Sequence, residues 1–207
     1  MRTKFRAMIV ILVLTVCNAK ANLIVNGDFE SGNTGFSTQY TYTENGTWPG
    51  RYSINTNPWN WDGSYHSFGD HTSGSGKMLL IDAAGPAGGT TGQTCWGQNI
   101  AVSNNKDYIF SAWIARICDG VGSTLKFSIN GATIGTVVIT SSSSGWFQFT
   151  NTWNSGLNTT ASIVICETTG NNSSGNDFAL DDISFIPEPA TMLIFGLGLL
   201  VLRKPGR

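Results

Sequence analysis

The sequence predicts an all-β protein built as a jelly-roll β-sandwich, and three observations support this prediction. Charged residues make up only 12% of the 207 residues, whereas Gly (25), Phe (11) and Trp (7) are plentiful. Short β-rich runs alternate with clusters of Gly, Asn and Ser, which is typical of strands joined by turns. No amphipathic helical stretch separates these runs, so a sandwich is favoured over a mixed fold.

The expected strands follow one another between residues 23 and 186. They are 23–30, 77–82, 93–102, 107–117, 124–129, 132–139, 145–153, 161–168 and 178–186. Asn130-Gly131 separates two of them and predicts a tight hairpin, because both residue types tolerate positive φ. Residues 31–76 are irregular and aromatic, so we expect long loops over one end of the sandwich.

The last expected strand contains a break in its alternation. Phe178 and Leu180 share one phase, but Ile183 lies on the opposite phase, so the pattern slips by one residue at Asp181-Asp182. A one-residue slip predicts a β-bulge, a feature that re-aims side chains.

The N-terminus has the features of a secretory signal peptide. Three basic residues precede an apolar run at 7–16, and Ala19 and Ala21 follow as small residues two positions apart. This arrangement predicts a signal peptide over residues 1–21, removed by signal peptidase before Asn22. A transmembrane anchor is the alternative, but a run of about ten residues is too short for a hydrocarbon core of roughly 30 Å.

The chain between the two ends is acidic. Residues 22–185 contain five basic and twelve acidic residues, which leaves a net charge of −7. An acidic body argues against nucleic acid as a partner.

Cysteine spacing leaves two alternatives open. After removal of the signal peptide the protein keeps Cys95, Cys118 and Cys166. Export permits one disulfide, and Cys118 with Cys166 is the favoured pair. Three free buried cysteines is the other alternative.

The C-terminal residues combine three features. Pro187-Glu188-Pro189 is followed by an apolar stretch at 192–202 and then by the basic residues Arg203 and Lys204. This combination resembles the PEP-CTERM sorting signal of Gram-negative bacteria. The resemblance implies a sorting tail over residues 187–207, with a short hydrophobic helix that holds the protein in the inner membrane.

The same resemblance implies a partner and a location. An exosortase would cleave near Pro-Glu-Pro after export and transient inner-membrane anchoring. The protein would then reside in the envelope, at the cell surface or in the extracellular matrix, where polysaccharide is the expected partner.

Acidic residues stand at both ends of the predicted domain. Asp28 and Glu30 lie in the first expected strand, and Asp181 and Asp182 lie in the last. Chain ends commonly lie close together, so these carboxylates are expected to converge. Converging carboxylates repel unless a cation or proton joins them, and Ca²⁺ is the hard cation expected outside the cell. Solvated acidic turns are the alternative.

The opening run Asn26-Gly27-Asp28-Phe29-Glu30 and the closing strand with its Asp resemble the galactose-binding-like jelly-roll domains, which include several carbohydrate-binding modules. The resemblance covers residues 22–186. It implies a structural Ca²⁺ held by the side chains of Glu30 and Asp181, with the backbone carbonyl of Asp28 as a further ligand. A backbone carbonyl near Lys77 is a weaker match. Asp182, next to the closing Asp181, is a further candidate for the metal site.

We expect a glycan-binding face to be formed by exposed aromatic rings, because flat rings stack on sugars. The candidates lie in the irregular region: Trp48, Tyr52, Trp59 and Trp61. The alternative is that these rings fasten long loops to the sandwich. Trp96 and Trp113 lie in strands and are expected in the core.

Catalytic motifs are lacking in the sequence. Asp70-His71 could form an acid–base pair, but adjacent residues of an extended chain point apart. Neither HExxH nor GxSxG occurs. We therefore expect a non-enzymatic exported protein with a structural or adhesive, carbohydrate-binding role. The alternatives are a small extracellular carbohydrate-active hydrolase and a matrix protein without glycan affinity.

Overall fold

Strands form at all but one of the positions that the sequence predicts. The computed structural model describes residues 21–83, 92–140, 145–169 and 175–188. Its strands are β1 (Thr41–Tyr42), β2 (Arg51–Asn55), β3 (Met78–Asp82), β4 (Thr94–Ala101), β5 (Asp107–Arg116), β6 (Ser123–Ile129), β7 (Ala132–Ile139), β8 (Phe147–Asn154), β9 (Thr160–Glu167) and β10 (Phe178–Pro187). A short helix, α1 (Pro58–Trp61), lies within the region expected to be irregular.

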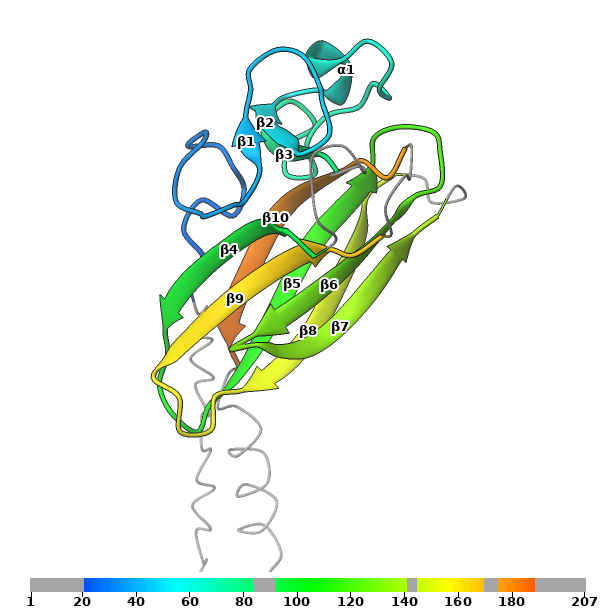
Figure 1. Cartoon of the computed structure of the whole chain (residues 1–207). Coiled ribbons are helices and arrows are strands. Elements are labelled where there is room, and N and C mark those ends of the chain that lie inside the picture. Colours follow the sequence, from blue (N-terminus) through cyan, green and yellow to red (C-terminus); the bar gives the residue numbers. More distant parts are fainter. Residues whose placement is uncertain (1–20, 84–91, 141–144, 170–174, 189–207) are drawn as a thin grey trace, which may run out of the picture. The chain divides into compact units, whose positions relative to one another are not determined.

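The strands form two layers, as expected for a jelly-roll β-sandwich (Figure 1). One sheet has the order β1-β2-β3-β10-β5-β8, and the other has the order β4-β9-β6-β7. All pairs are antiparallel except β1 with β2. The last strand, β10, lies between β3 and β5, so the C-terminal end of the domain belongs to the middle of a sheet.

The predicted hairpin and the predicted bulge are both confirmed. Asn130 and Gly131 join β6 to β7 with φ angles of 51° and 79°, the left-handed conformation that a tight hairpin turn needs. The register between β10 and β5 shifts between Asp181 and Ser184, and Asp182 has a φ of 44°. The local sequence therefore specifies both irregularities.

The prediction of a first strand over 23–30 is wrong. Asn26 and Phe29 both have a φ of 55°, which bends the chain into turns. The Asn26 amide holds these turns by donating to the carbonyls of Gly32 and Thr34. Gly27 packs so closely on β10 that a Cβ there would lie 2.1 Å from the carbonyl oxygen of Ile183. Turn-forming residues override the β-rich composition of this segment.

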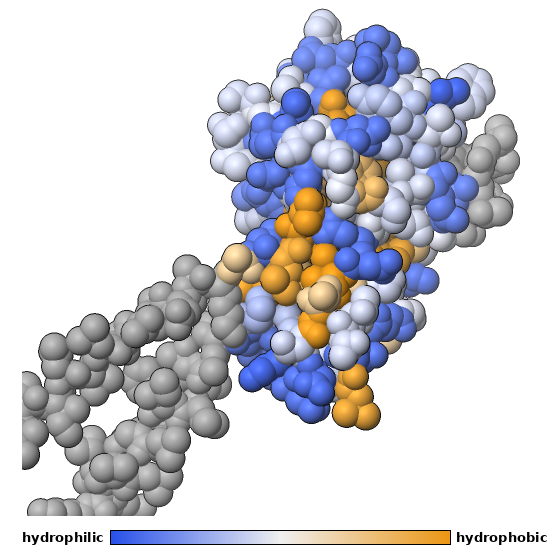
Figure 2. Space-filling model, turned by 90° about the vertical axis from the view of Figure 1, so that its left-hand side faces the viewer, coloured by the Kyte–Doolittle hydropathy of each residue, from blue (hydrophilic) through white to orange (hydrophobic). Residues whose placement is uncertain are grey.

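The main core lies between the two sheets. Its largest fully buried side chains include Phe29, Trp96, Phe110, Phe127 and Phe178. Trp96 is thus in the core, as predicted. Some apolar surface stays outside: Figure 2 shows apolar side chains in the middle of one side with hydrophilic ones around them.

A second, smaller core lies on the outer face of the six-stranded sheet. The segment that follows β2 packs Trp61 and Tyr65 onto this face. The sheet contributes Met78, Leu80, Ala115, Ile117 and Ala179. The loops expected over one end of the sandwich therefore cover part of one sheet face.

The final strand extends beyond the expected domain boundary at 186. Pro187 continues β10 opposite Tyr108, and the compact unit runs from Ala21 to Glu188. Proline fits here because the next residue, Glu188, donates its N–H to Asp107 on β5, so position 187 needs no donor.

Several predictions concern residues that the structure does not describe. These are the signal peptide apart from Ala21, including Ala19, and the tail residues Pro189, Arg203 and Lys204. Within the described ranges, no helix has the length and apolar character needed to cross a membrane.

The cysteines of the described domain are Cys95, Cys118 and Cys166, and all three are buried and unpaired. The favoured Cys118–Cys166 disulfide is therefore not formed in this structure.

Candidate functional site

The candidate site lies on the outer face of the six-stranded sheet, beside the second core. Along β5, Ala115 belongs to the second core, whereas Ser111 and Trp113 point to the same face without that cover. Trp113 is half-buried rather than part of the core, so the prediction for this residue is wrong.

These uncovered residues line a pocket of about 420 Å³ between the sheet and the N-terminal segment. Its lining residues are Asn22, Ile24, Asn26, Gly27, Asp28, Ser111, Trp113, Gln148, Asp182, Ile183 and Ser184. Most of them carry amide, hydroxyl or carboxylate groups, and Trp113 supplies the aromatic surface. Among the described residues, no lysine or arginine lines this pocket.

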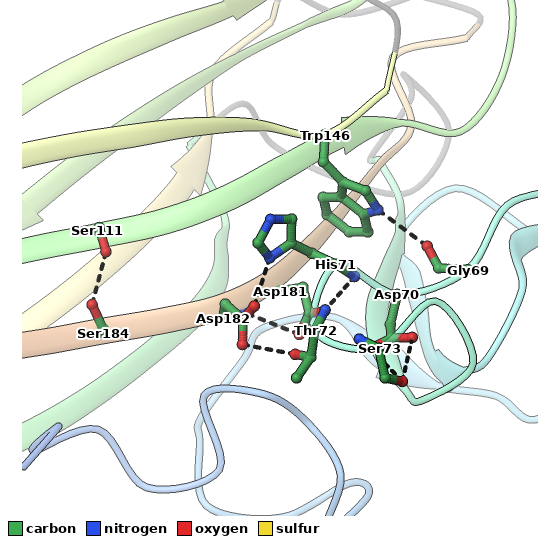
Figure 3. Close-up of polar contacts among 10 residues, drawn as sticks. All are labelled: Gly69, Asp70, His71, Thr72, Ser73, Ser111, Trp146, Asp181, Asp182 and Ser184. Atoms are coloured by element: carbon green, nitrogen blue, oxygen red, sulfur yellow. Dashed lines mark hydrogen bonds and ion pairs between the residues drawn. The ribbon is translucent and has the colours of Figure 1, made fainter.

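The bulge in β10 gives this face two consecutive aspartates (Figure 3). Leu180 and Ile183 both point into the main core, so the two residues between them lie on the outer side of the sheet. Asp181 is fully buried and accepts the backbone N–H of His71 at 2.8 Å. Asp182 instead borders the pocket. The bulge thus separates a buried carboxylate from one that faces the pocket.

His71 joins Asp182 to the aromatic wall of the pocket. Its Nδ1 lies 2.6 Å from Oδ2 of Asp182, and Thr72 donates its hydroxyl to Oδ1 at 2.8 Å. The imidazole stacks on Trp113 with ring centroids 3.7 Å apart. Trp146 meets the imidazole edge-on and donates its Nε1–H to the carbonyl of Gly69. The loop before β3, which contains Gly69 and His71, therefore fixes the position of Trp113.

Two further carboxylates meet at Gly76. A Cβ on this glycine would lie 2.0 Å from Oε1 of Glu30 and 3.0 Å from Oδ2 of Asp70. Glu30 Oε1 accepts the N–H of Lys77 at 2.6 Å, and Asp70 accepts the N–H groups of Ser73 and Gly76. Because Gly76 has no side chain, both carboxylates can approach the backbone at this position.

Burial has different consequences for the two buried carboxyl groups of this region. It raises the pKa of Asp181 to about 7, although three backbone N–H groups oppose the shift. At Asp70 burial also acts to raise the pKa, but hydrogen bonds from Ser73, Gly76 and Ser75 outweigh it and lower the pKa.

The structure brings the predicted metal ligands only partly together. Glu30 and Lys77 are in contact, whereas Asp182 is engaged by His71 and Thr72 and faces the pocket. Asp28 is exposed and also lines the pocket. Within the described residues, no group of three or more His, Cys, Asp or Glu side chains is placed to hold one metal ion.

The predicted ligand-binding aromatics divide into two pairs. Trp48 and Trp59 expose 62% and 56% of their surface. Tyr52 and Trp61 expose only 6% and 3% of their surface, so the prediction that they offer rings to a ligand is wrong. Trp61 packs in the second core because it follows Pro58 in the short helix that covers the sheet.

A separate pair of acids lies at the edge of the second core. Asp177 accepts hydrogen bonds from the N–H of Ala83, the hydroxyl of Tyr65 and the thiol of Cys118. Burial, reinforced by the charge of Asp177, raises the pKa of Asp82 to about 8. Burial also raises the pKa of Asp177. The folded domain therefore favours a protonated carboxyl group in the pair formed by Asp82 and Asp177.

Residues 185–204 match the PEP-CTERM protein-sorting motif, which confirms the resemblance of the C-terminus. This motif is that of exported bacterial proteins, typically Gram-negative, that are processed by exosortase. A comparison with curated protein sequences found no match.

The chain is similar in structure to solved proteins of several kinds. A cyclase from Fischerella sp. TAU is 11% identical, with 82% of this chain and 98% of that chain covered and a TM-score of 0.57. The enzymatically active domain of tailspike protein 4 from bacteriophage CBA120 is 12% identical, with 81% and 21% covered and a TM-score of 0.51. A CBM4 structure is 18% identical, with 80% and 99% covered and a TM-score of 0.45. At these identities the first two likenesses establish the fold alone.

Proposed function

We propose that this exported protein binds carbohydrate in the pocket beside Trp113. The observation that supports this proposal is the composition of the pocket, which combines one indole with several neutral hydrogen-bonding side chains. Indole surfaces bind the C–H faces of sugars, and amides and hydroxyls bind their hydroxyl groups. A volume of about 420 Å³ lies within the usual range for small-ligand sites.

The charges around the pocket favour neutral or amine-bearing sugars. Asp28 and Asp182 are the ionisable residues that line it. A uronate or sulfated glycan would bring negative charge towards these carboxylates, which is unfavourable without a compensating cation.

A glycan array with the purified protein tests this proposal. Replacement of Trp113 by Ala is expected to weaken binding by about tenfold or more, as for a central aromatic contact. Trp48→Ala and Trp59→Ala serve as matched controls, because both rings are exposed and neither lines the pocket. Binding that survives Trp113→Ala but is lost in either control would move the site to the loop aromatics.

The hydrolase alternative is decided by a second assay on the same glycans. Release of reducing ends that is lost in Asp182→Asn, with the fold intact, would replace the binding function by hydrolysis. A folded protein that neither binds nor cleaves any glycan would favour a matrix protein without glycan affinity.

We also propose that Ca²⁺ supports the fold at Glu30 and Asp70. Their convergence at a position that lacks a side chain fits a hard cation bound by oxygen. Asp181 approaches the same loop through its bond with the His71 N–H. Bound Ca²⁺ would neutralise these carboxylates and fasten the loop to the turn at Glu30. Asp182 and Asp28 do not fit this set, because they face the pocket.

The sorting motif supports a sequence of locations. The protein would be held transiently at the inner membrane and then reach the envelope, the surface or the extracellular matrix. A role in adhesion or matrix structure there would use the proposed glycan affinity.

A further inference from the structure

The sorting motif overlaps the last strand of the folded domain. The match begins at Phe185, which is fully buried in the main core. Strand β10 continues to Pro187, the first residue of the Pro-Glu-Pro tripeptide. Pro187 and Glu188 are both half-buried. The first part of the motif is therefore also part of the β-sandwich.

One side of this segment is bonded to β5. Ile186 lies opposite Ile109, and Pro187 lies opposite Tyr108. Glu188 then donates its backbone N–H to the carbonyl of Asp107 at 2.8 Å. Strand β5 therefore pairs with the chain as far as Glu188, the second residue of the tripeptide.

Side chains add to this contact. Glu188 Oε1 accepts a hydrogen bond from the hydroxyl of Thr152 on β8 at 3.4 Å. The ring of Tyr108 stacks on that of Phe185, with centroids 4.8 Å apart. Two neighbouring strands therefore hold the residues around Pro187.

The opposite side of β10 is bonded to the N-terminal segment. Leu23 donates its N–H to the carbonyl of Phe185 at 3.0 Å. The Asn22 side chain accepts the N–H of Phe185 at 2.9 Å and donates to the carbonyl of Ile183 at 3.0 Å. Both sides of the strand that leads into the motif are therefore occupied.

An enzyme that binds a peptide in extended form uses the same backbone and side-chain groups that a sheet uses. We propose that the folded domain shields the start of the sorting motif, and that exosortase binds Pro187 and Glu188 only after the end of β10 leaves β5. Processing would then depend on local opening of the strand end. This inference rests on the sorting role of the motif.

Local opening at this point is feasible because Pro187 and Glu188 lie at the very end of a strand. Pro187 has no N–H, so among the described residues the N–H of Glu188 makes the last backbone hydrogen bond from this end of the chain to β5. Strand ends with few bonds open far more often than the domain unfolds. The tripeptide can thus be exposed while Phe185 stays in the core.

A spacer experiment with the full chain in an exosortase-bearing host tests the proposal. Gly-Ser-Gly-Ser inserted between Ile186 and Pro187 moves the tripeptide out of the sheet and keeps its distance from the apolar stretch. If the sheet shields the motif, the tail should be removed about tenfold faster, as measured by pulse-chase. The reason is that exosortase could then bind the tripeptide without prior opening of the strand end. The same spacer inserted after Thr191 is the matched control and should give no such acceleration.

The outcomes separate this inference from the sorting role. Normal processing of the wild type without acceleration by the upstream spacer overturns the inference and leaves the sorting role intact. A wild-type tail that is never removed overturns both. Equal acceleration by both spacers also overturns the inference, because chain length would then be the cause.

Amide exchange gives a readout that does not depend on processing. In the full chain, purified in detergent from a host without exosortase, the Glu188 amide should exchange about tenfold or more slowly than in a free peptide. Exchange at the free-peptide rate would show that this end of β10 is not held, and would overturn the proposal.

Discussion

The imidazole of His71 lies on the indole of Trp113, with ring centroids 3.7 Å apart and planes 16° from parallel. The same imidazole contacts Asp182 through Nδ1. A residue of the loop before β3 thus positions two groups that line the pocket, although its own ring is absent from the lining.

Replacement of His71 by Ala should weaken glycan binding without abolishing it. Loss of a stacked ring costs about 1 kcal/mol, which corresponds to a roughly fivefold increase in Kd. His66→Ala is the matched control, because His66 pairs with Asp119 away from the pocket. Titration of the best array ligand measures the effect. Equal Kd values for His71→Ala and the wild type would contradict the positioning role.

Gly76→Ala should destabilise the protein and remove its response to chelation. The added Cβ would lie 2.0 Å from Oε1 of Glu30, so this exposed carboxylate must move away from Asp70, and the stability that a shared Ca²⁺ supplies would be lost. EDTA should lower the Tm of the wild type, because an ion bound only by the native state stabilises it.

Gly63→Ala controls for the loss of a glycine, since its Cβ would meet only Nε1 of Trp59 at 3.9 Å. This variant should keep both the stability and the EDTA effect. An unchanged wild-type Tm in EDTA would exclude the calcium proposal.

Asp82→Asn should reduce the loss of stability at rising pH. The folded-state pKa of Asp82 is raised from 3.8 to about 8. Its protonated form therefore stabilises the fold most fully at low pH, and this contribution is lost as the pH rises through the window from about 4 to 8. The slope is at most about 1.4 kcal/mol per pH unit for one group.

Urea unfolding of wild type and Asp82→Asn between pH 5 and 8 measures this difference, within the window set by the raised pKa. Wild-type stability should fall more steeply than that of the variant. Parallel pH profiles would mean that Asp82 does not hold its proton in the folded state.

Gly131→Ala should lower the free energy of unfolding by about 1 kcal/mol. Gly131 has a φ of 79° in the turn between β6 and β7, a conformation that is strained for alanine. A steric clash does not contribute, because no atom lies within 4 Å of the position where a Cβ would lie. The urea midpoint measures the change. An unchanged midpoint would show that the turn adapts to a side chain.

The strands could be predicted where one face alternates cleanly or where a turn motif fixes the register. Leu125, Phe127 and Ile129 are buried in β6 while the residues between them are half-buried, as the alternation indicates. The slip at Asp181-Asp182 likewise predicted the bulge. These features depend on neighbours in the chain, which a sequence displays directly.

The pocket could not be predicted because residues far apart in the chain form it. Nothing near Trp113 in the sequence indicates that the second core stops before this residue. The sequence places His71 next to Asp70, whereas the partners of its side chain, Trp113 and Asp182, are distant in the chain. The composition of 23–30 was misleading because the turn at Gly27 depends on contact with β10.

The hydrogen bond between Phe185 and the Asn22 side chain joins residues 163 positions apart. The chain of an exported protein crosses the membrane from its N-terminus, so Asn22 arrives long before its partner. The sandwich can close only when nearly the whole polypeptide has been translocated. Until then β10 is missing between β3 and β5, and the nascent domain exposes two unpaired strand edges to the chaperones and proteases that it meets after export.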